Sequence, residues 1–283
     1  MRWTTLIDTD ELLAAPARGD WAVVDCRFDL ADPEAGRRAW QRAHIPGAFH
    51  ADLDHDLSGP VTGSTGRHPL PDPDALVAWL ERHGIGNETQ IVVYDDGPGA
   101  MAARFWWLMR WLGHEAVAVL DGGLAAWRDA GGALTDETPE PSHRSRYRAH
   151  PGSMPVVGTE TLAGTLDGFC VVDARSRERY RGDAEPIDPV AGHVPGALSR
   201  PVSANLGDDG RFLPVSELRG QWSQILDRAS GRPVVAICGS GVSACHHVLA
   251  LAHAGLAEAA LNPGSWSEWI RDPNRPVATG EEA

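Results

Sequence analysis

Val234-Val-Ala-Ile-Cys-Gly-Ser-Gly-Val-Ser-Ala-Cys245 is the stretch that decides the fold of this chain. Its apolar, mostly β-branched start predicts a buried strand that stops at Cys238, and the glycines that follow predict a tight loop. Ala244 and Val248 then recur at the spacing of one helix face. A cysteine in such a loop lies where backbone N–H groups converge and where the helix dipole stabilises a thiolate. Cys238 is therefore a candidate nucleophile.

Two other interpretations of this loop are open on the local pattern. The spacing from Gly239 to Ala244 also matches a dinucleotide-binding turn, but that turn opens a nucleotide-binding half-domain, and too few residues follow here to build one. Alternatively, Cys238 is a buried small residue at a strand end, which is the common fate of a free cysteine.

Composition limits the class of protein. With 283 residues the chain is long enough for two domains, and its net charge of -14 argues against nucleic-acid or anionic-membrane partners. No segment is long and apolar enough to span a bilayer, and the first residues do not resemble a signal peptide, so a cytoplasmic location is expected. Four cysteines without paired spacing predict neither a disulfide framework nor a zinc site. The adjacent His246 and His247 point in different directions on a helix, so no metal is expected there.

An internal repeat organises the chain. Trp21-Ala-Val-Val-Asp-Cys-Arg27 is followed by the turn His44-Ile-Pro-Gly-Ala48, and the same pattern returns as Phe169-Cys-Val-Val-Asp-Ala-Arg175 followed by His193-Val-Pro-Gly-Ala197. In each half a further apolar strand, a glycine-containing loop and a helical pattern come next. A repeat of this length indicates a duplicated domain.

Alternating strands and helices predict an α/β fold with a mostly parallel sheet flanked by helices in each half. We expect a first domain over residues 1–134, a polar and proline-rich linker over 135–155, and a second domain over 156–283. Ligands of parallel sheets bind beyond the carboxyl ends of the strands, where Cys238 lies. The first half carries Asp95 and no thiol in the matching loop, so only the second half is expected to be catalytic.

The repeated Asp-x-Arg and His-(Ile/Val)-Pro-Gly-Ala patterns, the cysteine loop and the closing Gly264-Ser-Trp-Ser-Glu-Trp269 resemble the tandem rhodanese family of sulfurtransferases. The resemblance covers nearly the whole chain and implies an inactive first rhodanese-like domain and an active second one. It implies that Cys238 takes sulfur from a donor as a persulfide and passes it to a thiophilic acceptor, with no metal or organic cofactor. The loop backbone at Gly239, Gly241, Val242 and Ser243 would bind the donor and stabilise the negative charge.

The sequence of the cysteine loop also indicates which sulfur donor is favoured. It has no basic residue such as those with which thiosulfate sulfurtransferases bind a dianion, and it is similar to the loop of 3-mercaptopyruvate sulfurtransferases, with Ser243 in place of threonine. The resemblance therefore favours 3-mercaptopyruvate, with thiosulfate as the alternative donor. It does not identify the acceptor among cyanide, a small thiol, thioredoxin or another protein. The protein is expected to be a monomer.

Three further residues match a proton-transfer triad proposed for that family. They are Ser240 in the loop, His68 and Asp54, the last two from the first half of the sequence. Each has a structural alternative: Ser240 as a partner of loop backbone groups, His68 as a surface histidine and Asp54 as a solvated turn residue.

Arg179 matches the family arginine that binds the donor's carboxylate, a task for which the planar guanidinium is suited. The alternative is a solvated arginine on a helix. The family has a second arginine shortly afterwards, in a Glu-Pro-Arg context, but this chain reads Glu185-Pro-Ile-Asp-Pro189, so the second arginine is missing.

Two other classes of function compete with sulfur transfer. Rhodanese-like cysteine phosphatases have a longer loop that ends in an arginine, whereas Ala244 stands six residues after Cys238 here. A non-catalytic rhodanese-like binding module usually lacks the loop cysteine, which this chain retains.

Overall fold

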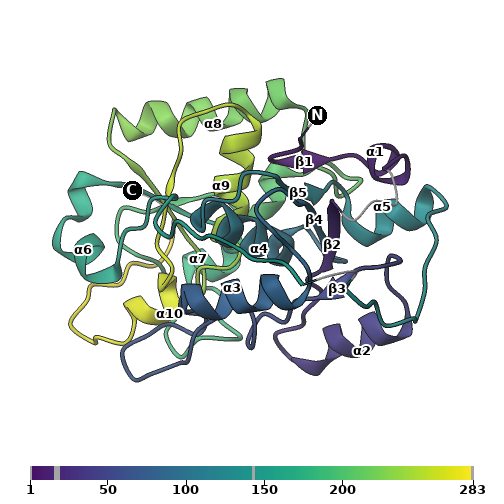
Figure 1. Ribbon diagram of the computed structural model, residues 1–283. Helices are drawn as coiled ribbons and strands as arrows, with labels where there is room; N and C mark the ends of the chain where they lie inside the picture. Colours follow the sequence, from purple (N-terminus) through teal and green to yellow (C-terminus); the bar gives the residue numbers. More distant parts are fainter. Residues whose placement is uncertain (1, 16–19, 142–143, 282–283) are drawn as a thin grey trace. The chain divides into compact units, whose positions relative to one another are not determined.

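The structure is a computed structural model that describes residues 2–15, 20–141 and 144–281 (Figure 1). Contacts divide the chain into two compact units. Unit 1 comprises described residues of Met1–Gly59, Leu70–Met154 and Asp209–Arg211, and unit 2 those of Pro60–Pro69, Pro155–Asp208 and Phe212–Ala283. Both are α/β units with parallel sheets, which confirms the predicted fold class.

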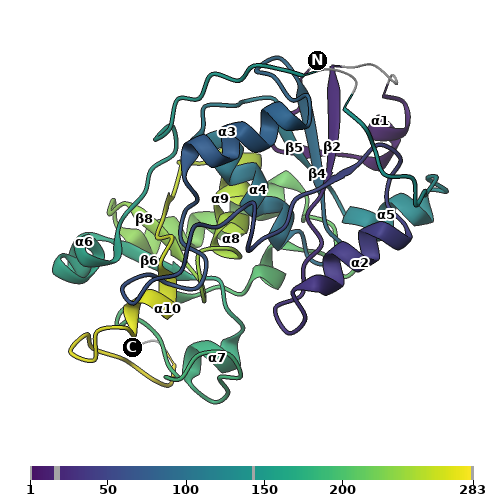
Figure 2. The ribbon, with the colours of Figure 1, turned by 60° about the horizontal axis from the view of Figure 1, so that its bottom comes forward.

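Unit 1 is built on a five-stranded parallel sheet in the order β1-β5-β4-β2-β3. Figures 1 and 2 show α3 and α4 on one side of this sheet and α1, α2 and α5 on the other. Because both faces are covered, the central strand β4 is buried at every position. The bounds are β1 Leu6–Ile7, α1 Thr9–Leu13, β2 Trp21–Asp25, α2 Glu34–Arg42, β3 Phe49–His50, α3 Pro73–Arg82, β4 Gln90–Tyr94, α4 Ala100–Trp111, β5 Val117–Leu120 and α5 Gly123–Asp129.

Unit 2 repeats this plan with a four-stranded parallel sheet in the order β7-β6-β8-β9. Helix α9 packs against β8 and α8, while α6 and α10 contact each other (Figure 2). The bounds are α6 Thr159–Gly164, β6 Cys170–Asp173, α7 Arg177–Arg181, β7 Leu198–Ser199, α8 Val215–Ala229, β8 Val234–Ile237, α9 Ala244–His253, β9 Ala260–Leu261 and α10 Ser265–Trp269, with short 3-10 turns at Leu166–Gly168 and Val202–Asn205.

The repeat seen in the sequence is a repeat of structure. In unit 1, Asp25 pairs with Tyr94 across β2 and β4, and in unit 2, Asp173 pairs with Ile237 across β6 and β8. Each strand-end aspartate is buried and forms a salt bridge with the arginine two residues later, at 2.7 Å in both units. Asp173 thus has a structural role, because its carboxylate is held by Arg175.

Residues 135–155 were expected to form a linker between the domains, but most of the described residues in this range pack with unit 1. The residues of this range up to Met154 belong to unit 1. Thr135 pairs with His44 through two backbone hydrogen bonds of 2.9 Å, and the buried Tyr147 donates its N–H to Glu81. The polar, proline-rich composition therefore describes a segment without regular structure that lies along unit 1; residues 142 and 143 lie outside the described part.

A buried polar cluster packs α9 of unit 2. Asn205 lies 3.1 Å from His246 Nδ1 and 3.0 Å from His247 Nδ1, and His247 Nε2 is 2.7 Å from the Arg200 carbonyl. Burial, and then the charges of His246 and Arg200, hold the pKa of His247 well below its ordinary value of 6.5. The two adjacent histidines are thus explained by packing within unit 2.

Acidification is expected to destabilise unit 2 through His247. The folded state disfavours the charged form, so below pH 6.5 the unfolded chain takes up a proton that the folded chain does not. Stability should fall with decreasing pH by up to about 1.4 kcal/mol per pH unit from this group. Urea unfolding between pH 7.5 and 5.5 should show a shallower pH dependence for His247→Gln than for the wild type. An equal dependence in the two proteins would contradict the assignment.

Candidate active site

The cysteine loop of unit 2, residues 238–243, joins β8 to α9. Cys238 is the first residue after β8, and its side chain is only 3% exposed. The Gly241 N–H donates to Cys238 Sγ at 3.1 Å. Gly241 has φ +76°, and a Cβ there would lie 2.3 Å from the Pro263 carbonyl oxygen, so only glycine fits. The loop therefore aims a backbone donor at the sulfur, where it stabilises negative charge.

A second segment, between β9 and α10, fixes the cysteine loop. The Cys238 N–H donates to Ser265 Oγ at 3.0 Å, and the Cys238 carbonyl accepts the Trp266 N–H at 3.0 Å. The Ser267 N–H donates to the Gly239 carbonyl at 2.8 Å. These contacts account for the Gly-Ser-Trp-Ser sequence around Trp266: its backbone and hydroxyl groups hold the loop in place.

Ser240 and His68 meet in unit 2. Ser240 Oγ lies 2.7 Å from His68 Nδ1, and both side chains are buried. The two residues come from segments far apart in the sequence, yet both belong to unit 2. A serine hydroxyl bonded to an imidazole can pass a proton in either direction.

The position of His68 corrects one expectation. The sequence placed it in the first domain, but residues 60–69 pack with unit 2 because their backbone is bound to α10. The Gly66 N–H donates to Glu268 at 3.2 Å, and the Arg67 N–H donates to Ser267 Oγ at 3.1 Å.

Arg179 is not the solvated helix residue that was the alternative. Its side chain is 17% exposed and forms hydrogen bonds with Glu185 at 2.8 Å and with Asp188 at 3.1 Å. Burial tends to raise the pKa of Glu185, but the donors from Arg179 and the backbone hold it below its ordinary value. A Cβ at Gly239 would lie 3.4 Å from Arg179 Nη2, so this guanidinium stands beside the cysteine loop.

The comparisons with known proteins agree with this geometry. Residues 8–130 and 159–272 match the model of the rhodanese-like domain, together well over half of the chain. The chain belongs to the rhodanese-like family. Each of the two matched segments falls on one of the two repeats described above.

Several relatives of the rhodanese-like chain span its whole length. It is 51% identical to a probable 3-mercaptopyruvate sulfurtransferase of Pseudomonas aeruginosa, over 98% of each chain. It is 42% identical to a putative thiosulfate sulfurtransferase of Mycobacterium tuberculosis, over 99% of this chain and 98% of the relative. Among solved structures, the 3-mercaptopyruvate sulfotransferase SseA of Escherichia coli superposes with a TM-score of 0.78 at 27% identity, over 94% of this chain and all of the other.

The two rhodanese-like repeats differ at the nucleophile position. Tyr94 and Ile237 occupy the same place in their sheets, so Asp95 of unit 1 stands where Cys238 stands in unit 2. The buried Asp95 carboxylate accepts four backbone N–H groups at 3.0–3.1 Å. In unit 1, therefore, the loop amides hold a carboxylate of the chain itself.

Asp54 is the third member of the expected triad. It lies in unit 1, whereas the cysteine loop belongs to unit 2. It is exposed, and its N–H donates to the Asp52 carboxylate at 3.0 Å. Partial burial, and then the charge of Asp52, raise the pKa of Asp54. A part for Asp54 in proton transfer stays a prediction.

Sequence reasoning missed three residues at or near the cysteine loop: Arg67, Asp188 and Ser265. Ser265 lies inside the motif that supported the family resemblance, and Arg67 directly precedes the predicted His68. Asp188 lies in the segment where the second family arginine is absent. These positions in the sequence were a signal, but only the fold shows that Ser265 and Arg67 reach the loop and that Asp188 pairs with Arg67 and Arg179.

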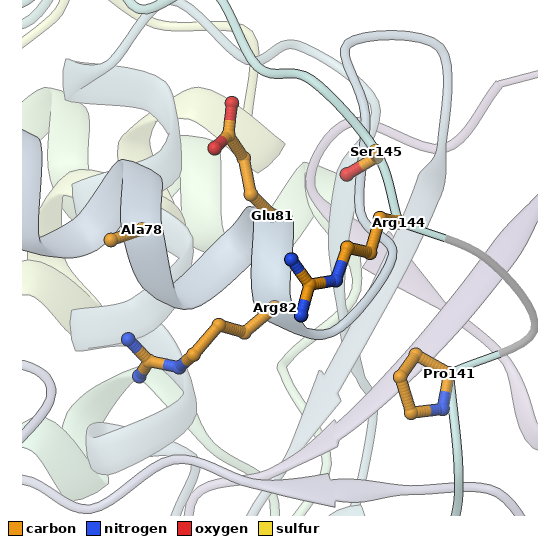
Figure 3. A pocket seen from close by; sticks show the side chains of 6 residues that line it. All are labelled: Ala78, Glu81, Arg82, Pro141, Arg144 and Ser145. Carbon is orange, nitrogen blue, oxygen red and sulfur yellow. The ribbon is translucent and has the colours of Figure 1, made fainter.

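A pocket of about 540 Å³ lies elsewhere, in unit 1 of the rhodanese-like chain (Figure 3). Arg82 and Arg144 contribute to its lining, with their guanidinium groups apart from each other (Figure 3). The hydroxyl of Ser145, also in the lining, donates to the Ile85 carbonyl at 2.7 Å. Among the described residues that line this pocket, none is a nucleophile comparable with Cys238.

Two features are absent from the described part of the rhodanese-like chain. In residues 2–15, 20–141 and 144–281, no three or more histidine, cysteine, aspartate or glutamate side chains gather as they would around a metal ion. Within the same ranges, every helix is too short or too polar to cross a membrane.

Proposed function

We propose that this chain is a sulfurtransferase that moves sulfane sulfur through a persulfide of Cys238, with 3-mercaptopyruvate as the favoured donor. The observation that carries the proposal is the buried Cys238 sulfur, which accepts the Gly241 N–H next to the guanidinium of Arg179. The names of the P. aeruginosa and E. coli proteins support this donor, and full-length similarity supports the comparison.

The first step is attack on the donor. The Cys238 thiolate attacks the thiol sulfur of 3-mercaptopyruvate, a sulfur–sulfur bond forms, and the bond from that sulfur to C3 breaks with its electron pair going to carbon. The enolate of pyruvate takes up the donor's thiol proton, so the products are the Cys238 persulfide anion and pyruvate. The Gly241 N–H stabilises the charge on the sulfur during this exchange.

Ser240 and His68 transfer the proton in this step. Their 2.7 Å contact links a hydroxyl to a group whose ordinary pKa is close to neutral. The thiol proton passes to this pair and from it to C3 of the leaving enolate. Thiosulfate carries no such proton, so the pair matters for a mercaptan donor.

The second step returns the enzyme to its starting state. A nucleophile such as cyanide attacks the outer sulfur of the persulfide and leaves as thiocyanate, and the Cys238 thiolate is restored. A small thiol or thioredoxin can take the place of cyanide. The proposal includes a monomeric, cytoplasmic enzyme with no metal or organic cofactor.

Thiosulfate is the second candidate donor, and the name of the M. tuberculosis relative favours it. The charge around the cysteine loop argues against thiosulfate as the donor. The loop itself carries no basic side chain, and one of the two guanidinium groups beside it, that of Arg179, is already paired with Glu185 and Asp188. A non-catalytic binding module is the remaining alternative, and it gives no reason for an N–H group aimed at the Cys238 sulfur.

Arg179→Ala is expected to lower kcat/KM for 3-mercaptopyruvate between about tenfold and a hundredfold, because a charge-assisted contact to the donor's carboxylate is lost. Sulfur transfer to cyanide is measured with 3-mercaptopyruvate and with thiosulfate. Arg177→Ala is the matched control, since Arg177 is an exposed arginine of the same helix α7. A wild type that prefers thiosulfate would refute the donor assignment, and one that uses neither donor would refute the enzymatic function.

A further inference from the structure

The positive charge beside the cysteine loop comes from two arginines of unit 2. A Cβ at Gly239 would lie 2.9 Å from Arg67 Nη2 and 3.4 Å from Arg179 Nη2. Gly239 directly follows Cys238 in the chain, so both guanidinium groups lie close to the nucleophile. The net charge of these two groups and their partners therefore acts on any anion that approaches the Cys238 sulfur.

Asp188 forms ion pairs with both of these arginines. Its Oδ1 pairs with Arg67 Nη1, and its Oδ2 accepts from Arg179 Nη2 at 3.1 Å. Its backbone N–H donates to the Glu185 carboxylate at 3.1 Å, which helps to hold the residue in place. Burial raises the pKa of Asp188, but the charges of the two arginines oppose this rise, so the carboxylate is ionised near neutral pH. The side chain is 3% exposed, and salt therefore screens its charge little.

The charges of this group of side chains cancel. Arg67 and Arg179 each carry one positive charge, and the carboxylates that pair with them, Asp188 and Glu185, each carry one negative charge. Glu185 also pairs with Arg175, at 3.4 Å, whereas Asp188 bridges the two guanidinium groups beside the loop. Loss of the Asp188 charge alone would therefore leave this side of the cysteine loop with a net positive charge.

We propose that Asp188 is a specificity-determining residue that disfavours sulfur donors with two negative charges. The inference rests on the proposed function and deepens it, because it concerns the choice of donor in the same reaction. The Asp188 charge repels an anion near Cys238 in proportion to the charge of that anion. A dianion such as thiosulfate is therefore repelled more than a monocarboxylate such as 3-mercaptopyruvate, and the difference is a source of specificity.

Asp188→Asn tests the inference, because asparagine keeps the size of the side chain and removes its charge. Values of kcat/KM for sulfur transfer to cyanide are measured with thiosulfate and with 3-mercaptopyruvate. The ratio of the two values cancels any change in the Cys238 sulfur that affects both donors alike. We expect the ratio of thiosulfate to 3-mercaptopyruvate to rise about tenfold in Asp188→Asn.

Two further variants separate the charge of Asp188 from its packing. Asp188→Glu keeps the charge and should keep the donor ratio of the wild type. Asp183→Asn is the matched control: it removes the same charge from an exposed residue shortly after α7, and it should leave the ratio unchanged. An unchanged ratio in Asp188→Asn would overturn the inference, and so would an equal rise in either of the other two variants. If Asp188→Asn does not fold, Asp188→Ser, which also lacks the charge, replaces it in this comparison.

A second measurement does not depend on sulfur transfer. Iodoacetate is a monoanion and iodoacetamide is its neutral analogue, and both alkylate a cysteine thiolate. The ratio of the iodoacetate rate to the iodoacetamide rate at Cys238 is measured by mass spectrometry of the peptide that contains this residue. It should rise about tenfold in Asp188→Asn and stay unchanged in Asp183→Asn.

The two measurements let the two proposals fail separately. A wild type that transfers no sulfur from either donor would refute the sulfurtransferase. If the alkylation ratio still rises in Asp188→Asn, the charge of Asp188 controls which anions reach Cys238, and this part of the inference stands. An alkylation ratio that does not rise would refute the charge effect, whether or not the wild type transfers sulfur.

Discussion

Replacing Cys238 with serine is expected to reduce sulfur transfer from either donor by at least about four orders of magnitude. A serine hydroxyl stays protonated near neutral pH, and it cannot form the sulfur–sulfur bond on which the two-step transfer depends. The substitution changes little else, because serine is close to cysteine in shape and its oxygen can accept the Gly241 N–H that now reaches the sulfur at 3.1 Å.

Two measurements check this result. In the first, the rate of thiocyanate formation is compared between the wild type and the variant. In the second, intact-protein mass spectrometry after incubation with the donor should show one added sulfur on the wild type and none on Cys238→Ser. Cys245→Ser is the matched control. Cys245 lies in α9, and its thiol donates to the Gly241 carbonyl at 3.3 Å, a contact that a serine hydroxyl can keep. A persulfide that forms on Cys238→Ser, or one that is lost in Cys245→Ser, would contradict the assignment of the nucleophile.

The fold could be predicted from the sequence because its strands are short, buried and repeated. The apolar runs at 21–25, 91–94, 170–173 and 234–237 all became strands of parallel sheets. Each run is apolar except for the aspartate that ends 21–25 and 170–173, as expected for strands of covered parallel sheets, and the patterns around Pro46 and Pro195 recur at matching places. The duplication gave these predicted strands and turns a second occurrence in the sequence.

The candidate site was only partly predictable, because half of it depends on contacts between distant segments. Cys238 and Ser240 share one loop; the local pattern located Cys238, and the family resemblance located Ser240. Arg67 reaches that loop only because backbone hydrogen bonds tie residues 66 and 67 to Ser267 and Glu268, and no periodicity records such a contact.

The charge around Arg179 shows the same limit. The sequence could say that an arginine was missing from the segment at Glu185, but not that Asp188 of this segment would pair with Arg67. An ion pair between residues so far apart is a property of the folded chain. Composition gives the number of charges and not their partners.

Replacing Asp95 with alanine is expected to destabilise unit 1 by about 1–3 kcal/mol, the cost of leaving buried hydrogen-bond donors without an acceptor. Oδ1 accepts from Gly97 and Gly99, and Oδ2 accepts from Met101 and Ala102, all at 3.0–3.1 Å. Without the carboxylate, these backbone donors at the start of α4 lose their acceptor in a place where water has little access.

The matched control for Asp95→Ala is Asp96→Ala, which removes the same charge from the exposed neighbouring residue and should change stability by no more than about 0.5 kcal/mol. Hydrogen exchange of the α4 amides, compared with those of α9 in unit 2, separates local from general destabilisation. Equal effects of the two substitutions would show that charge, and not the bound carboxylate, matters. The expected difference would show that the Asp95 carboxylate stabilises the loop of unit 1. The amides of that loop are bound by its own aspartate, whereas the loop of unit 2 directs the Gly241 N–H at a sulfur that can react.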